Sequence, residues 1–401
     1  MPLLIEALRI TNSLRLDEPT FDLSGEVDWG ELLHHADGHS LTPLLFNVWG
    51  NAGQLDVLPE VSRTRMEQTY TDNAARNENI RHELLDVHEI LTNATIPHVV
   101  LKGWPLVERL YAAPSERVLY DHDLLVPAEA AKRGQRALLA AGFRPRPTKD
   151  EWNEKHLPPV WRNDDYQWDD YLFDPNYPRP VELHTALWER GWRGLHVKPL
   201  TGLWSRVQER NVAGNTMQVL SDEDQIIHLS VHFAEHLVQR EARLNQLLDL
   251  ARLLRTAVDA NWDDILERAG QGNVVRFVFA SISLAEQIFG ASLPPVQIWQ
   301  SLTEQTPLAF REWLAAQGAH DVLTSDYRQP AHDRTYLLTF LAAHSIAEKF
   351  GIVRFAALPP IAHLMHKYAV TQPGQGVLMY PRFMLERAGR FGRDFLLRSR
   401  S

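Results

Sequence analysis

The sequence contains no cysteine among its 401 residues. This absence excludes disulfides, thiolate zinc sites, iron–sulfur clusters and cysteine nucleophiles. No apolar run approaches the roughly 20 residues needed to span a bilayer. The first residues, Met1–Glu6, lack a basic segment and carry Glu6 inside the apolar stretch, so we expect no signal peptide. Together these absences predict a cytoplasmic protein that does not act at a membrane.

Positive charge is also scarce. The chain has 41 Lys and Arg against 51 Asp and Glu, a formal net charge of −10 at pH 7. Proteins that bind long nucleic acids usually present a basic face to the phosphates, so we expect no such partner. Hydrophobic residues make up 44% and charged residues 23%, the balance of a globular chain with a large core. The length suggests roughly two or three domains.

Three common signatures of nucleotide-binding and hydrolytic folds are missing. No G-x-G-x-x-G follows a predicted strand, and neither G-x-x-x-x-G-K-[ST] nor G-x-S-x-G occurs. Rossmann, P-loop and α/β-hydrolase folds are therefore not supported.

Hydrophobic periodicity divides the chain into three regions. Apolar residues recur at three- and four-residue steps through residues 1–95, which predicts an N-terminal helical region. Residues 96–205 form a predicted α/β core, and the helical pattern returns over residues 206–401. A loop is predicted over Thr371–Gly376. The predicted fold class is α+β, with a small mixed sheet flanked by N-terminal and C-terminal helical regions.

Local patterns give the elements of the core. Gly103 ends the first expected strand, and Gly142 lies at the C-terminal end of the second expected helix. Ser221, followed by acidic residues, has the pattern of a helix N-cap. The expected strands are Ile96–Gly103, Val118–Val126 and Pro180–His184, and the expected helices are Pro105–Tyr111 and Ala128–Ala141.

The most informative segment is the strand that carries Asp121 and Asp123. Residues two apart share one face of a strand, so these carboxylates project side by side, while Tyr120, His122 and Leu124 point the other way. Adjacent carboxylates facing a pocket repel one another unless a cation neutralises them. Mg²⁺ prefers such hard oxygen ligands, and substrate phosphates can complete its coordination shell. A solvated pair of aspartates is the alternative for an isolated Asp-x-Asp.

Here the sequence resembles a known family. Leu101–Tyr111, Arg117 and Asp121–Val126 resemble the uncharacterised bacterial nucleotidyltransferase family of the polymerase-β-like nucleotidyltransferase superfamily. That superfamily has a strand ending in Gly, a strand with two alternating carboxylates, and a third carboxylate on a later strand. The resemblance extends along most of the chain, including Asp28–Trp29 and Val181–His184.

The resemblance implies a role for each residue of the motif. Asp121 and Asp123 would hold two Mg²⁺ ions, one on the triphosphate and one on the attacking hydroxyl. Gly103 would let backbone N–H groups approach the phosphates. Lys102 and Arg117 would neutralise charge on the triphosphate or on the departing pyrophosphate.

The third carboxylate requires a choice. Glu182 is preferred because Val181 and Leu183 flank it with strand alternation, so its side chain can leave the core face and join the metal site. His184 shares that face and is expected to bond a metal ligand or the substrate. The alternative acids precede this strand: Asp164, Asp165, Asp169, Asp170 and Asp174.

Two residues depart from the superfamily pattern. Trp104 stands where a small or hydroxyl residue usually follows the glycine, which removes a hydroxyl contact and is expected to narrow the pocket. His122 lies between the aspartates in place of an aliphatic residue. Because it faces the core, we expect a neutral, hydrogen-bonded histidine in preference to a titratable switch.

A second motif has the spacing of a zinc site. His232, Glu235 and His236 match H-x-x-E-H, an inverted zinc-protease pattern in which both histidines lie on one face of a helix. His228 extends the same row. The motif is weak in a chain with 18 histidines, and no third ligand is evident. Structural histidines, or polar residues facing the nucleotide, are the favoured interpretation. Asp249 is expected either to face the same cleft or to complete a buried polar network.

The sequence thus predicts a nucleotidyltransferase that uses Mg²⁺, with ATP the expected NTP, and transfers a nucleotidyl group to an acceptor hydroxyl while releasing pyrophosphate. The acceptor is a small molecule, a natural-product intermediate, a peptide or a protein. Two alternatives stay open: a catalytically decayed nucleotide-binding regulatory protein, and a metal-dependent glycosyltransferase. The second needs a nucleotide-binding βαβ unit before the Asp-x-Asp motif, where this sequence is helical.

Overall fold

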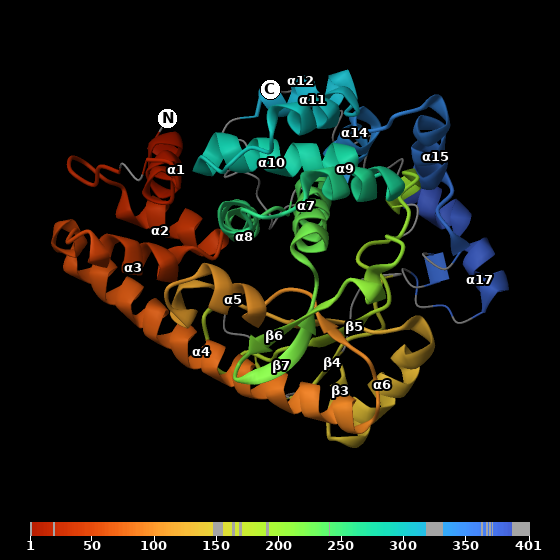
Figure 1. Cartoon of the computed structure of the whole chain (residues 1–401), viewed down its shortest axis with the longest axis horizontal. Helices are drawn as coiled ribbons and strands as arrows, with labels where there is room; N and C mark the ends of the chain where they lie inside the picture. Colours follow the sequence, from red (N-terminus) through yellow and green to blue (C-terminus); the bar gives the residue numbers. More distant parts are fainter. Residues whose placement is uncertain are drawn as a thin grey trace.

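The computed structural model of the chain describes residues 2–18, 21–146, 155–162, 165–167, 171–189, 192–239, 241–317, 332–361, 364, 365, 368, 370 and 372–386. It is an α+β protein, as predicted, with helices on either side of one mixed sheet (Figure 1).

The N-terminal region is helical, as its apolar period predicts. Asp28 caps one of these helices, and its side chain accepts a hydrogen bond from the backbone N–H of Glu31. The longest described helix, α4, runs along one side of the molecule (Figure 1). No βαβ unit lies among the described residues before the Asp-x-Asp motif. These helices are α1 (Pro2–Ser13), α2 (Trp29–Gly38), α3 (Thr42–Asn51) and α4 (Glu60–Asn93), with a short 3₁₀ turn η1 (Leu55–Val57).

Seven strands form the sheet, in the order β3-β4-β5-β2-β1-β7-β6. At its centre β2 pairs in parallel with β5 and antiparallel with β1, while β1 pairs in parallel with β7. The outer pairs are antiparallel. The strands are β1 (Val99–Val100), β2 (His122–Leu125), β3 (Arg144–Pro145), β4 (Val160–Trp161), β5 (Val181–His184), β6 (Gln208–Val212) and β7 (Asn215–Val219).

The strands at the centre are shorter than predicted, but they lie within the predicted segments. The sheet also continues past residue 205, through β6 and β7, which the sequence pattern did not indicate. The domain boundaries after residues 95 and 205 stay predictions. Within the core lie two helices, α5 (Trp104–Leu110) and α6 (Ala128–Ala140), and the short 3₁₀ helices η2 (Pro114–Glu116), η3 (Trp192–Gly194) and η4 (Leu203–Ser205).

One face of the sheet is covered by α4 and α6. Leu124 of β2 and Leu183 of β5 pack with Leu91 of α4 and with Leu138 of α6, and all four are fully buried or nearly so. The opposite face of the same strands is turned toward α7 and α8, which lie on the other side of the sheet (Figure 1). Residues that alternate along β2 and β5 are therefore divided between a hydrophobic layer and the space beneath these helices.

The C-terminal region is helical and shares a hydrophobic cluster with the N-terminal helices and with part of the core. Ser221 caps α7 as predicted, because its hydroxyl accepts a hydrogen bond from Asp224 N–H at 3.3 Å. The predicted loop over Thr371–Gly376 is wrong from Pro373 onward: a helix begins there, with the proline in its first turn, where no N–H is needed. These helices are α7 (Asp222–Gln239), α8 (Leu244–Thr256), α9 (Trp262–Gln271), α10 (Val275–Phe289), α11 (Val296–Glu304), α12 (Leu308–Ala315), α14 (His332–Leu341), α15 (Ile346–Ala357) and α17 (Pro373–Leu378). No described helix is both long and apolar enough to cross a membrane.

Candidate active site

The parallel pairing of β2 with β5 brings acidic residues from distant parts of the chain together. Asp123 lies directly opposite Glu182 in the register. Their neighbours Leu124 and Leu183 point into the layer beneath α4 and α6, so both carboxylates face the other way. Asp121 lies two residues before Asp123, just ahead of β2, and lines the same cavity.

Two of these carboxylates and a neighbouring histidine are close enough to share one cation. Asp123, Glu182 and His184 each offer a ligand atom, and these atoms all lie within 4.8 Å of one another. His184 Nε2 is 2.8 Å from Asp123 Oδ1 and 3.5 Å from Glu182 Oε2. No other group of three or more such ligands is found in the described part of the chain. The donor set is two carboxylates and one imidazole.

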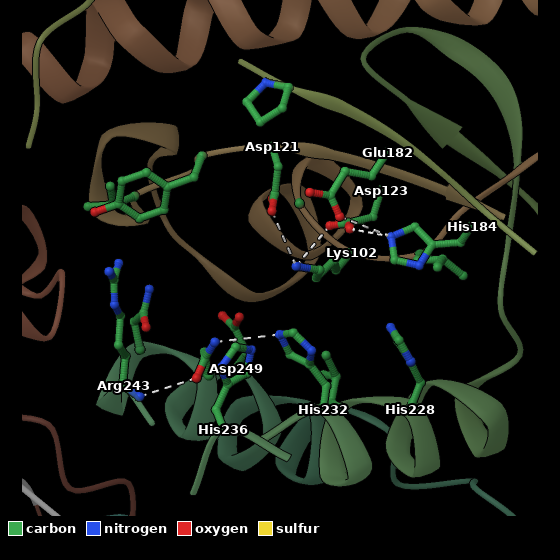
Figure 2. Close-up of a pocket in the computed structure, with 18 of the residues that line it drawn as sticks. Lys102, Asp121, Asp123, Glu182, His184, His228, His232, His236, Arg243 and Asp249 are labelled. Atoms are coloured by element: carbon green, nitrogen blue, oxygen red, sulfur yellow. Dashed lines mark hydrogen bonds and ion pairs between the residues drawn. The ribbon is translucent and has the colours of Figure 1, made fainter. Parts of the chain in front are cut away.

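Lys102 lies against these acids. Its Nζ is 2.8 Å from Asp123 Oδ2 and 3.7 Å from Asp121 Oδ2 (Figure 2). Lys102 is followed by Gly103, the residue just before α5. The φ of Gly103 is 81°, a backbone angle that favours glycine. A Cβ at Gly103 would meet no protein atom within 4 Å, so the backbone angle, not the space, is what favours glycine there.

The charges of this group perturb one another. Burial and the charge of Asp123 raise the pKa of Asp121 to about 6. Burial favours the neutral form of Asp123, but Lys102 and a hydrogen bond with His184 hold the pKa of Asp123 well below its ordinary value. Burial also opposes ionisation of Lys102, but the negative charges of Asp121 and Asp123 raise its pKa. The acids therefore carry more negative charge than Lys102 alone neutralises.

We call Lys102, Asp121, Asp123, Glu182 and His184 the acidic wall. It bounds a cavity of about 580 Å³. Across this cavity lie α7 and α8, with His228, His232 and His236 in one row on α7. We call these three residues the histidine wall. Figure 2 shows the two walls facing each other.

The histidine wall is electrically neutral. Burial, together with the charge of Lys102, lowers the pKa of His228 to about 3 and that of His232 well below its ordinary value. Burial also lowers the pKa of His236, to about 4. Near neutral pH each ring therefore offers one N–H donor and one acceptor nitrogen.

The H-x-x-E-H residues form no three-ligand cluster among the described residues. Glu235 is engaged with Lys155, whose Nζ lies 3.3 Å from Glu235 Oε2. His232 Nε2 is 3.5 Å from Gln246 Nε2 on α8. The row faces the cavity, and this agrees with polar residues lining a ligand site better than with an inverted zinc-protease site.

Arg117 lines the cavity but is already paired. Its Nε lies 2.9 Å from Asp249 Oδ1, and its Nη2 donates to Asp249 Oδ2 at 2.6 Å. Tyr111 donates a third bond to the same carboxylate at 2.6 Å. Both expectations for Asp249 are met, since it lines the cavity and completes a buried network. Arg117 is therefore a partly neutralised cation, unlike the one in the sequence-based prediction.

Two predicted orientations are wrong. Tyr120 lines the cavity, because it precedes β2 and strand alternation does not extend to it. Trp104 does not narrow the cavity: its indole is buried among Ile80, Leu84 and Val219 on the far side of the sheet. His122 faces the core as expected, and its Nε2 lies 3.1 Å from Glu83 Oε2.

The two alternative acids that the structure describes do not join the wall. Asp174 accepts a hydrogen bond from Tyr166 at 2.6 Å, and neither Asp174 nor Asp165 lines the cavity. Asp164, Asp169 and Asp170 lie outside the described residues. Among the described acids of this segment, Glu182 is the one that the fold brings beside Asp123.

Several cavity residues were not anticipated from the sequence. Lys155 and His156 come from a segment that pairs with β5, and His156 Nε2 lies 3.4 Å from Glu182 Oε2. Arg243 reaches the cavity from just before α8 and lies over the ring of Tyr120. No local motif marks these residues, because only the tertiary fold brings them to the site.

The comparisons with known proteins agree with this geometry. The model of a family described as an uncharacterised nucleotidyltransferase matches residues 25–290, more than half of the chain and a range that includes both walls. No curated protein matches. The acidic wall brings carboxylates from neighbouring strands together in a group that could hold a metal ion. The chain belongs to this family of uncharacterised nucleotidyltransferases and is, by that membership, an enzyme that acts on a nucleotide.

Proposed function

We propose that this enzyme transfers a nucleotidyl group from an NTP to an acceptor hydroxyl and releases pyrophosphate, with a divalent metal bound at the acidic wall. The observation that supports this most strongly is the buried group of Asp123, Glu182 and His184 with Asp121 beside it. A solvated pair of aspartates at a strand edge would not lie in a cavity opposite a second wall of polar side chains.

The residues present fit a metal ion. Three carboxylates and Lys102 leave an excess of negative charge, and the pKa of Asp121, raised to about 6 by burial and by Asp123, shows that this excess is unfavourable. A bound cation would relieve it. Mg²⁺ fits the carboxylates, and we propose two ions, as in related transferases. The metal would supply charge neutralisation at the phosphates and at the attacking oxygen.

The protein's own groups orient the nucleotide. We propose that Lys102 and the Gly103 turn bind the phosphates, because this lysine is the cation closest to the acids. His184 would hold Asp123 in place through its bond to Oδ1. Arg117 would act on the phosphates as a cation already shared with Asp249.

The nucleotide and the acceptor are proposed less specifically. We propose ATP as the NTP. The acceptor would carry a hydroxyl, on a small molecule, a natural-product intermediate, a peptide or a protein. The cavity of about 580 Å³ lies within the usual size range of ligand pockets. It therefore has room for a nucleotide and a small group of the acceptor.

The test is incubation with each of ATP, GTP, CTP and UTP, labelled on the α-phosphate, with Mg²⁺. We expect one nucleotide to release pyrophosphate and to transfer label, and we expect no release by the Asp121→Asn/Asp123→Asn double variant. Nucleotide binding without any pyrophosphate release, whatever the metal and acceptor, would instead support the catalytically decayed regulatory protein. Release by the double variant at the wild-type rate would contradict the proposal.

A further inference from the structure

Two buried histidines on opposite walls of the cavity carry ring nitrogens without a hydrogen-bond partner among the described residues. His184 Nδ1 has no hydrogen-bond partner among the described residues, and neither has Nδ1 or Nε2 of His228. Both residues are almost fully buried, His184 4% and His228 3% exposed. They come from opposite walls, β5 and α7, and Figure 2 shows the two rings facing each other.

Unpaired polar atoms in such a place indicate a ligand. A buried donor or acceptor without a partner costs about 1–3 kcal/mol, so native proteins rarely leave several together. The Nε2 of His184 is already turned to Asp123, which leaves Nδ1 to face the gap. The gap between His184 and His228 is therefore built to receive a small hydrogen-bonding group beside the acidic wall.

The charges around the gap exclude some occupants. Lys102, Lys155, His184 and Asp123 are the charged or titratable groups that act on His228. Lys155 is paired with Glu235, and Lys102 lies against Asp121 and Asp123. A triphosphate gains most beside Lys102, whereas the neutral imidazole of His228 compensates phosphate charge poorly. A hydroxyl, which donates one hydrogen bond and accepts others, matches one donor and one acceptor nitrogen.

We propose that the gap between His184 and His228 holds the acceptor hydroxyl, and that His228 is a catalytic residue that orients this hydroxyl through a hydrogen bond. This inference rests on the proposed nucleotidyl transfer. The hydroxyl oxygen forms a bond to the α-phosphorus, the bond from that phosphorus to the bridging oxygen of pyrophosphate breaks, and the hydroxyl proton passes to solvent water. Pyrophosphate leaves with the electron pair of the broken bond. No other reactant is needed.

The first test is a crystal structure of the full chain with Mg²⁺ and α,β-methylene-ATP, soaked in glycerol as the hydroxyl probe. We expect a glycerol hydroxyl or a water within hydrogen-bond distance of His228, on the side of the α-phosphorus opposite the leaving group. A phosphate oxygen or the base in the gap, or an empty gap, would overturn the inference. Failure of the analogue to bind would contradict the proposed function instead.

The second test separates catalysis from folding. We expect His228→Ala to lower the turnover of Mg²⁺-ATP, with water or glycerol as acceptor, by roughly ten- to a hundredfold, while the Kd of α,β-methylene-ATP stays within about twofold. His228→Gln, which keeps a hydrogen-bonding side chain, should recover part of the turnover. His82→Ala is the matched control, because that histidine is exposed on α4. An equal loss of analogue affinity and turnover in His228→Ala, or no loss of turnover, would overturn the role of His228.

Discussion

The two walls of the cavity differ in how they balance charge. The acidic wall concentrates three carboxylates and compensates them only partly with Lys102. The histidine wall concentrates three imidazoles, and burial together with nearby Lys102 keeps them neutral. The acidic wall therefore attracts cations and the phosphates bound to them. The histidine wall offers hydrogen-bond donors and acceptors that carry no charge.

The difference shows how a transferase can separate its two substrates. A charged donor nucleotide and an uncharged hydroxyl need different surroundings, because desolvating a charge costs far more than desolvating a hydroxyl. With the charges at and beside β2 and β5 and the neutral groups on α7, the proposed function would give each substrate its own wall. Variants of one wall should thus fail differently from variants of the other.

The largest effect is expected on the acidic wall at Asp123. Replacing Asp123 with Asn removes a ligand of the proposed metal and should lower turnover by about a thousandfold or more, since a bound metal contributes several kcal/mol of charge stabilisation. Steady-state pyrophosphate release measures this, and circular dichroism should show an intact fold. Glu129→Gln, an exposed acid on α6, is the control that makes the same charge change. A normal rate in Asp123→Asn would remove that residue from the site.

Lys102→Met should come next. Charge develops on the leaving pyrophosphate, so a cation beside the acids matters more in the transition state than in binding. We expect kcat to fall by roughly ten- to a thousandfold with a smaller rise in KM. Full steady-state kinetics with Mg²⁺-ATP decide the question. Near-normal kcat with only a raised KM would show that the phosphates lie against other cations.

Arg117→Met should lower kcat as well, but it should also destabilise the protein, unlike Lys102→Met. It leaves Asp249 buried and deprived of its bidentate partner, which typically costs about 3–5 kcal/mol. Denaturant unfolding should show this loss, and the double variant Arg117→Met/Asp249→Leu should recover most of it. Unfolding curves of Arg117→Met that overlay those of the wild type would mean that the pair is not the main role of Arg117.

On the histidine wall we expect no zinc. His232, Glu235 and His236 form no metal cluster in the described part of the chain, so elemental analysis should find no stoichiometric zinc in the purified protein. His232→Ala should retain most of the thermal stability. One zinc per chain, lost in this variant, would show that the histidine wall is a metal site. That result would contradict its description as a neutral wall.

The smallest effect concerns Asp121 without metal. Its pKa is raised to about 6 from 3.8, so the folded state binds this proton more tightly than the unfolded state. Its contribution to stability is greatest below pH about 4 and is lost as the pH rises through about 6. Asp121→Asn should therefore raise the Tm in EDTA at pH 7.5 by about 1–3 °C and change it little at pH 4. A larger gain at pH 4 would contradict the proposed repulsion.

Much of the acidic wall could be predicted from local pattern. Alternation along a strand placed Asp123 and Glu182 on the face opposite Leu124 and Leu183, and the parallel register then brought them together. Short-range geometry is sufficient for such residues, because a strand has a fixed period of two. The same rule failed at Tyr120, where the strand had not yet begun.

The remaining site residues depend on the tertiary fold. The pairing of Arg117 with Asp249 joins residues from the core and from α8, far apart in sequence, and no motif records it. Lys155 reaches the cavity through a segment that pairs with β5. The helical period showed that the histidines share one face of α7, but not what that face meets.

The central claim is that the acidic wall binds a nucleotide through a divalent metal. The most direct measurement is titration calorimetry with α,β-methylene-ATP, which needs no acceptor. We predict binding in the presence of Mg²⁺, weakened at least about tenfold when EDTA replaces the metal, and a comparable weakening in the Asp121→Asn/Asp123→Asn variant with Mg²⁺ present. Equal affinity of the wild type with Mg²⁺ and with EDTA, unchanged in the double variant, would contradict the account.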